Sequence, residues 1–318
     1  MRPYDPGYRA PRSGRVLAAA LAGVVCGLLP IAGSLTTAAS PSPSLASTSI
    51  PSPSLASTSS PGLRVAVVGD MVCPVRCPRS ADVAALVTSL HPDAFLGLGD
   101  LLNNTADWSL YDAQWGTLKG ITYPLPGNHE YSADIDAYNQ YWGDAAHAPL
   151  HYYSFDLGSW HVVALNGEAD TSSGSPQETW FQADLAAHPA ACTAVLIHGP
   201  RWSSSNDHPS DPSLQALWGV AVGGHVDLWL SGHNHLYERF DPLDADGLPY
   251  DDGTTEMVIG TGGRQLHRFD REPLQGEVIR DNETFGAGLF TLGDGRWSME
   301  FLPIPGQTFT DSASGTCH

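Results

Sequence analysis

The sequence predicts an α/β fold: a four-layer α/β/β/α sandwich of two mixed sheets with flanking helices. In the first part of the body, apolar strand patterns alternate with helical patterns, as in layered α/β folds. The chain then changes to a hairpin and to strands without helices between them, which fits two sheets better than one doubly wound sheet. Residues 62–318 of the 318-residue chain are long enough to bury a substantial core.

The individual elements follow from periodicity. Strand patterns lie at 64–70, 94–100, 151–158, 160–167, 193–200, 226–235, 257–263, 286–295 and 296–304, and a strand-to-loop transition lies at 121–130. Helical patterns lie at 80–91, 107–119, 176–188 and 211–223. Ser80 and Ser175-Pro176 predict the starts of two helices. The tight turn at 158–160 predicts an antiparallel hairpin.

The first 61 residues do not resemble a folded domain. Residues 1–39 begin with four arginines, continue with an apolar run and end in small residues, which is typical of a secretory signal. Residues 40–61 contain a duplicated Pro- and Ser-rich decapeptide and predict a linker. We therefore expect a secreted protein with one folded domain at 62–318 and no membrane segment after cleavage. An uncleaved membrane anchor is the alternative, because the apolar run approaches the ~20 residues that span a bilayer.

The body is strongly acidic. The formal net charge is −19, and removal of residues 1–39, with four arginines and one aspartate, changes it to −22. Lys119 is the only lysine. Nucleic-acid binding relies on clustered Lys and Arg, so we expect no nucleic-acid partner. We also expect a monomer.

Four cysteines remain after signal cleavage, an even number that predicts two disulfides with three possible pairings. We favour Cys73–Cys77, which are close in sequence, and Cys192–Cys317, which would tie the C-terminus to the body. A metal knuckle at Cys73 and Cys77 is the weaker alternative, since no second Cys or His pair stands at matching distance.

Polar residues with metal-ligand chemistry stand at or just after the ends of predicted strands. Ligands of α/β sheets bind at this edge, where loops from distant parts of the chain converge. Two carboxylates, an amide and three imidazoles suit zinc, manganese or iron, and two such ions can activate water for attack on phosphorus. The six candidates are Asp70, Asp100, Asn128, His198, His233 and His235.

The ordered motifs GD (69–70), GD (99–100), GNHE (127–130), LIH (196–198) and GHNH (232–235) resemble the calcineurin-like metallophosphoesterases. HGPRWSS (198–204) and GHNHLYERF (232–240) resemble the purple acid phosphatase branch more closely. The resemblance covers most of residues 62–318. It implies that residues 62–318 are a metallophosphoesterase catalytic domain whose partner is a small phosphate-ester substrate. Such an enzyme would hydrolyse phosphomonoesters, with diesters as a further class, by attack of a metal-activated water at a dinuclear site.

The resemblance also implies roles for single residues. Asp70 and His235 would bind the first metal, and Asp100 would bridge both metals. The second metal would be held by Asn128, His198 and His233. The ions would be two divalent or mixed-valence transition metals, namely zinc, manganese or iron.

Three further residues have expected roles at the substrate. His129 is the candidate catalytic acid and would contact the phosphate. Asn128 and Arg201 are further candidates for substrate binding, although Arg201 could equally be a solvated loop residue. The histidines outside the motifs are expected to be ordinary core or surface residues: His147, His151, His161, His188, His208, His225, His267 and His318.

The chain departs from the family pattern at the first metal. Many members have His two residues after the first Asp, where this chain has Val72. The purple branch has Tyr three residues after the second Asp, whose phenolate holds ferric iron, and this chain has Asn103. Asn103 or Asn104 could supply a weaker amide ligand. These departures motivate an alternative function, a degenerate, non-catalytic phosphate- or surface-binding protein.

Overall fold

The computed structural model describes residues 62–318, and the signal and linker predictions for residues 1–61 lie outside this range. The described helices are α1 (Ser80–Ser89), α2 (Ser109–Trp115), α3 (Asn128–Ala133), α4 (Ile135–Trp142), α5 (Pro176–Ala187) and α6 (Gln215–Gly223), with 3-10 turns at Gly116–Ile121, Gly143–Ala146 and Pro212–Leu214. The strands are β1 (Leu63–Val68), β2 (Ala94–Leu98), β3 (Thr122–Leu125), β4 (Tyr153–Leu157), β5 (Trp160–Ala164), β6 (Cys192–Ile197), β7 (Leu228–Ser231), β8 (Tyr237–Leu243), β9 (Thr254–Ile259), β10 (Glu277–Asp281), β11 (Gly286–Gly293), β12 (Arg296–Pro303) and β13 (Asp311–Thr316).

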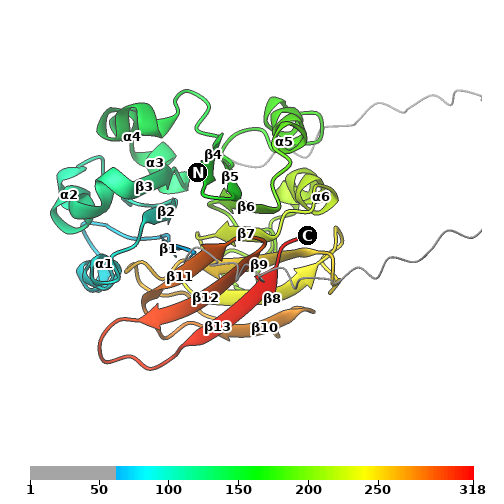
Figure 1. Cartoon of the computed structure of the whole chain (residues 1–318). Coiled ribbons are helices and arrows are strands. Elements are labelled where there is room, and N and C mark those ends of the chain that lie inside the picture. The colour runs from blue at the N-terminus through cyan, green and yellow to red at the C-terminus, as the bar shows by residue number, and fades with distance from the viewer. Residues whose placement is uncertain (1–61) are drawn as a thin grey trace, which may run out of the picture. The chain divides into compact units, whose positions relative to one another are not determined.

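These strands form two mixed sheets, as predicted (Figure 1). The first sheet has the order β13-β12-β11-β1-β2-β3 and the second β10-β8-β9-β7-β6-β5-β4. In the first, β1, β2 and β3 are parallel, and β11 pairs antiparallel with β1. In the second, β5, β6, β7 and β9 are parallel, and β4 and β5 form the predicted antiparallel hairpin.

The core lies on both faces of the second sheet. Successive strand residues point to opposite faces, so Val162 and Ala164 join the hydrophobic cluster shared with the first sheet. Val163 and Leu165 join a separate cluster with residues of α5 and α6. Burial on both faces explains why these strands are apolar throughout rather than alternating.

The helices cover the outer faces. In Figure 1, α1 to α4 lie beside β1, β2 and β3, and α5 and α6 lie beside β5, β6 and β7. Trp115 at the end of α2 stacks on Phe95 of β2 at 5.4 Å between ring centroids. On the other side, Trp218 of α6 meets Trp229 of β7 edge-on at 5.3 Å. Aromatic pairs of this kind add to the burial that fixes each helix on its sheet.

Some local predictions need correction. Ser80 does not cap α1: the cap position is Arg79, while Ser80 is buried and its hydroxyl accepts a bond from Trp115 Nε1. Strands β8, β10 and β13 have no counterpart among the predicted strands. The last of these is made of small polar residues and pairs only with β12, so hydrophobic periodicity could not detect it.

Both favoured disulfides are present, Cys73–Cys77 and Cys192–Cys317. The second joins the start of β6 to the residue after β13, across 125 positions of sequence. It therefore links the C-terminal strand of the first sheet to the centre of the second. Among the described residues, no helix has both the length and the apolar composition needed to cross a bilayer.

Candidate metal centre

The predicted site residues converge where parallel strands of both sheets end. Asp70 and Asp100 follow β1 and β2, Asn128 follows β3, and His198 and His233 follow β6 and β7. Asp70, Asp100 and His198 are buried, and each offers a ligand atom within 4.8 Å of the others. The structure thus brings together carboxylates and imidazoles that lie up to 163 positions apart in sequence.

Three of these residues have a left-handed backbone. The φ angles of Asp70, Asp100 and His233 are 61°, 49° and 65°. Non-glycine residues are uncommon in this region, and such positions concentrate at functional sites. Glycine is required beside them: a Cβ on Gly127 would meet the carboxylate of Asp100, and one on Gly232 would meet that of Asp70.

Two histidines are oriented by main-chain carbonyls. His198 Nδ1 lies 2.8 Å from the carbonyl oxygen of Leu98, and His235 Nδ1 lies 2.8 Å from that of Gln265. A carbonyl only accepts, so each Nδ1 carries the proton. Each Nε2 is then turned toward the carboxylates, the arrangement that fixes the tautomer of metal-binding histidines.

His198 Nε2 is the centre of one group of atoms. It lies 3.1 Å from Asn128 Oδ1, 3.2 Å from His233 Nδ1 and 3.4 Å from Asp100 Oδ1. Two imidazole nitrogens that face each other at this distance need a proton or a cation between them. These four side chains form a mixed nitrogen and oxygen set suited to a divalent transition metal.

Asp70 and His235 form a second group. Asp70 Oδ2 accepts a bond of 2.7 Å from the backbone amide of His233, while its Oδ1 is buried without a hydrogen-bond partner. His235 Nε2 lies 3.4 Å from that oxygen. A buried carboxylate oxygen without a partner is costly, and a bound cation would satisfy it. The residues present therefore fit a metal at this position as well.

The charge of Asp100 dominates the electrostatics. Burial alone would raise the pKa of Asp100, but His198 and His129 hold it well below its usual range. Burial opposes charge on His198 as well, yet the Asp100 carboxylate raises the pKa of His198 to about 10. Burial and the charge of His198 lower the pKa of His233 to about 2. Without a metal, the charges of His198 and Asp100 therefore stabilise each other.

Glu130 of the GNHE motif holds the loops together and was not assigned a role from the sequence. Its buried carboxylate accepts bonds from the backbone amides of Gly127, Leu102 and Asp100, at 2.8, 2.9 and 3.1 Å. Burial and the Asp100 charge raise the pKa of Glu130 to about 8. This residue ties the turn after β2 to the start of α3 and so positions Asn128.

His129 lies at the edge of the cluster. Its amide donates to Asp100 Oδ1 at 2.9 Å, and its Nε2 lies 3.7 Å from Asp100 Oδ2. The side chain is 21% exposed, so it faces both the buried carboxylate and solvent. Burial lowers its pKa, which Asp100 raises and Arg264 lowers.

Asn103 has all its polar atoms engaged. Its amide nitrogen donates to the carbonyls of Asp100 and Val72, and its oxygen accepts from the guanidinium of Arg264. Arg264 Nη1 also lies 3.9 Å from Asp100 Oδ2. The guanidinium of Arg264 therefore lies next to the Asn103 amide oxygen, which was expected to replace a missing ligand of the first metal. Arg264 was not identified from the sequence.

The Arg201 guanidinium donates to Gln215 Oε1 and stacks on the Trp202 ring at 3.7 Å. Its expected role in substrate binding stays a prediction. Two histidines outside the motifs lie against candidate ligands: the His208 ring is tilted by 38° to that of His233 with centroids 3.9 Å apart, and the His267 ring stacks on that of His235 at 3.8 Å.

Comparisons with known proteins agree with this geometry. Residues 63–237 match the family model described as calcineurin-like phosphoesterase. This match covers more than half of the chain, and the chain therefore belongs to that family.

Its curated relatives include purple acid phosphatases. Purple acid phosphatase 22 of Arabidopsis thaliana is 28% identical over 263 residues, covering 73% of this chain and 59% of that protein. Purple acid phosphatase 21 of the same plant is 30% identical over 230 residues, covering 64% of this chain and 51% of that protein. The chain thus spans little more than half the length of these relatives. A further relative, named probable inactive purple acid phosphatase 9, is 25% identical over 183 residues. This match covers 26% of that protein.

The fold is shared with solved structures. A purple acid phosphatase from yellow lupin (Lupinus luteus) seeds aligns with a TM-score of 0.64 at 21% identity, covering 80% of this chain and 53% of that one. GAP50, the anchor in the inner membrane complex of Plasmodium, aligns with a TM-score of 0.65 at 14% identity. The alignment covers 81% of this chain and 90% of that one. At these identities the likeness concerns the fold.

Metal binding should release a proton near pH 7. The pKa of His198 is raised to about 10 without metal, so its imidazole is charged at pH 7 and must lose a proton to bind a cation. We expect the calorimetric enthalpy of zinc or manganese binding to vary with the ionisation enthalpy of the buffer, with a slope near one proton. His198→Asn should reduce the slope, and the exposed control His225→Asn should not. A slope of zero in the unaltered protein would contradict the charged His198.

Proposed function

We propose that the protein is an exported, metal-dependent phosphoesterase that hydrolyses phosphomonoesters, with phosphodiesters as a second substrate class. The observation that supports this most is the convergence of His198 Nε2, His233 Nδ1 and Asn128 Oδ1 beside Asp100, within a chain of the phosphoesterase family. The disulfides are compatible with export, because such bonds persist in oxidising compartments.

The six side chains would hold two transition-metal ions, for which zinc, manganese and iron are the candidates. Asp70 and His235 would bind one ion, and Asn128, His198 and His233 the other, with Asp100 shared between them. When bound, such ions neutralise a phosphate ester and supply a nucleophilic water near neutral pH. The buried carboxylates and backbone-fixed imidazoles keep this ligand set in place before any ion arrives.

His129 is our candidate for the general acid. Its ring is partly exposed next to Asp100, and its Nδ1 is buried without a hydrogen-bond partner. A histidine at this place can hold a proton for the leaving oxygen of an ester, provided that the substrate lies within hydrogen-bond reach. Asn128, at the adjacent position, would contact the same phosphate.

The contact between Asn103 and Arg264 favours a second candidate, a phosphate-binding protein without turnover. The guanidinium lies near Asp100 and is bonded to the residue that stands where the purple branch has its tyrosine. A fixed cation there could replace part of the charge of the first metal. Turnover separates the two functions, since only the enzyme hydrolyses an aryl phosphate in a metal-dependent way.

The first test removes the shared carboxylate. We expect Asp100→Ala to abolish hydrolysis of p-nitrophenyl phosphate and to lower the metal content, because this carboxylate serves both groups of ligands. Asp82→Ala is the matched control, since Asp82 is exposed on α1 and pairs with Arg79. Near-normal turnover in Asp100→Ala would refute the proposed site.

The second test separates the acid from the ligands. His129→Ala should keep its metal content but lose rate, because general acid catalysis typically contributes ~10²–10⁴-fold. Elemental analysis and turnover are measured on the same preparation, with His225→Ala as control. Metal loss equal to that of Asp100→Ala would make His129 a ligand or the support of one.

The third test concerns the missing tyrosine. With Asn103 in its place there is no phenolate to bind ferric iron, so the purified protein should be colourless even when iron is bound. Activity should return after chelation when manganese or zinc is added, because the ligands suit divalent ions. A visible phenolate band or tightly held ferric iron in the unaltered protein would show that another residue supplies the phenolate.

A further inference from the structure

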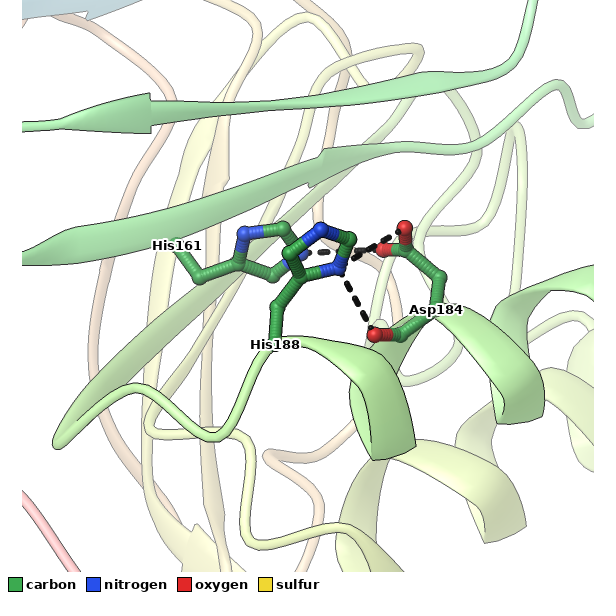
Figure 2. Close-up of side chains that lie close together, drawn as sticks. All are labelled: His161, Asp184 and His188. Carbon is green, nitrogen blue, oxygen red and sulfur yellow. Dashed lines mark hydrogen bonds and ion pairs between the residues drawn. The ribbon is translucent and has the colours of Figure 1, made fainter.

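A second set of metal-ligating side chains lies away from the candidate centre. It consists of His161 on β5 and of Asp184 and His188 at the end of α5, whose ligand atoms lie within 4.8 Å of one another. Figure 2 shows the two imidazoles stacked beside Asp184, with a nitrogen of His161 directed at its carboxylate and a nitrogen of His188 directed at both its carboxylate and its main-chain oxygen. We propose that this cluster binds a divalent transition-metal ion, zinc first of all, as a structural site.

A nitrogen of each ring lies close to the Asp184 carboxylate, and His188 Nδ1 also lies 2.9 Å from the main-chain oxygen of Asp184. His161 Nε2 lies 2.9 Å from Asp184 Oδ2, and His188 Nδ1 lies 3.2 Å from Asp184 Oδ1. The two rings are 4.6 Å apart and inclined by only 16°. Two nitrogens and a carboxylate oxygen that face one another are the donor set of three-ligand zinc sites, with a fourth position for water.

Two of the three residues have the supporting contact that metal sites use. His161 Nδ1 lies 3.0 Å from Asp156 Oδ1, so a proton on Nδ1 is shared with a carboxylate and Nε2 is directed at Asp184. This carboxylate–histidine pair is the usual arrangement behind a metal-binding histidine. Ser154 donates its hydroxyl proton to Asp184 Oδ1 at 2.8 Å, which fixes the carboxylate.

The place in the fold also favours a cation. Asp184 and His188 stand at the C-terminal end of α5, where carbonyl oxygens give the helix a partial negative charge. The side chains of His161 and Asp184 are buried, while that of His188 is 48% exposed. His188 also lines a surface pocket of about 440 Å³, so an ion can enter from solvent.

This site is separate from the candidate phosphoesterase centre. His161 pairs with Thr193 near the start of parallel strands β5 and β6, whereas His198 follows the end of β6. The proposed ion would join the β4–β5 hairpin to α5 and would not touch the ester. Loss of this ion should therefore lower stability and leave turnover unchanged.

The simpler interpretation is a hydrogen-bonded cluster without metal. His161 bonds to Asp156 and Asp184, and His188 Nδ1 donates to the main-chain oxygen of Asp184 at the helix end, at 2.9 Å. A bound ion would have to replace the proton on His188 Nδ1 and break this bond. The two interpretations differ in one measurable property, zinc bound per chain.

The test uses a protein whose phosphoesterase centre is disabled by Asp100→Asn and His198→Asn. After chelation and addition of zinc, the protein should retain one equivalent of zinc through gel filtration. Its Tm should rise with zinc concentration. Cobalt should give visible absorption bands of a low-coordinate site. Adding His188→Ala should remove the zinc equivalent, the bands and the Tm response, whereas adding His225→Ala, an exposed neighbour in the same pocket, should change none of them.

Further variants keep the outcome decisive. In the otherwise unaltered protein, His188→Ala should lower zinc content by one equivalent with normal turnover. Asp156→Asn should weaken zinc binding ~10–100-fold, as loss of a supporting carboxylate does. The proposal is overturned if no zinc binds to the disabled protein, or if His188→Ala keeps the equivalent. Equal loss in His225→Ala would also overturn it, by showing adventitious binding to surface histidines. Each result is independent of whether the protein hydrolyses phosphate esters.

Discussion

Hydrogen bonds between the ends of the two sheets determine the geometry of the candidate centre. His198 follows β6 of the second sheet, and its Nδ1 proton is bound by the Leu98 carbonyl on β2 of the first. In the reverse direction, Asp70 follows β1 of the first sheet and accepts the amide of His233 from the second. In a buried, low-dielectric setting such bonds are strong and costly to leave unmade. Neither sheet can slide along the other without losing them, so the ligands keep their spacing.

The parts of the site that could be predicted are those encoded locally. Asp70, Asp100, His198 and His233 each follow an apolar strand, and parallel strands end at one edge of a sheet, so their convergence follows from topology. Arg264 could not be found in this way, because it comes from an irregular loop after β9 and reaches Asn103 from 161 positions away.

The remaining differences concern side-chain direction. The sequence could not show that the Arg201 guanidinium donates to Gln215 and stacks on Trp202. His208 and His267 lie over the metal-type histidines because two loops fold across them, and isolated histidines carry no periodic signal. The strands of the sheets could be predicted because they carry a periodic signal. Val162 and Val163, for example, belong to a run of apolar residues that are buried on both faces of the sheet.

The left-handed backbone at Asp70, Asp100 and His233 has an evolutionary consequence. Each such residue costs on the order of 1–3 kcal/mol, and asparagine tolerates this conformation readily. The fold itself is held by the core and the disulfides, which these side chains do not form. A change such as aspartate to asparagine at position 70 thus removes chemistry while leaving the scaffold intact. Selection for folding alone does not preserve the metal-type residues. Proteins of this architecture can therefore lose catalysis gradually and persist as stable proteins with other functions.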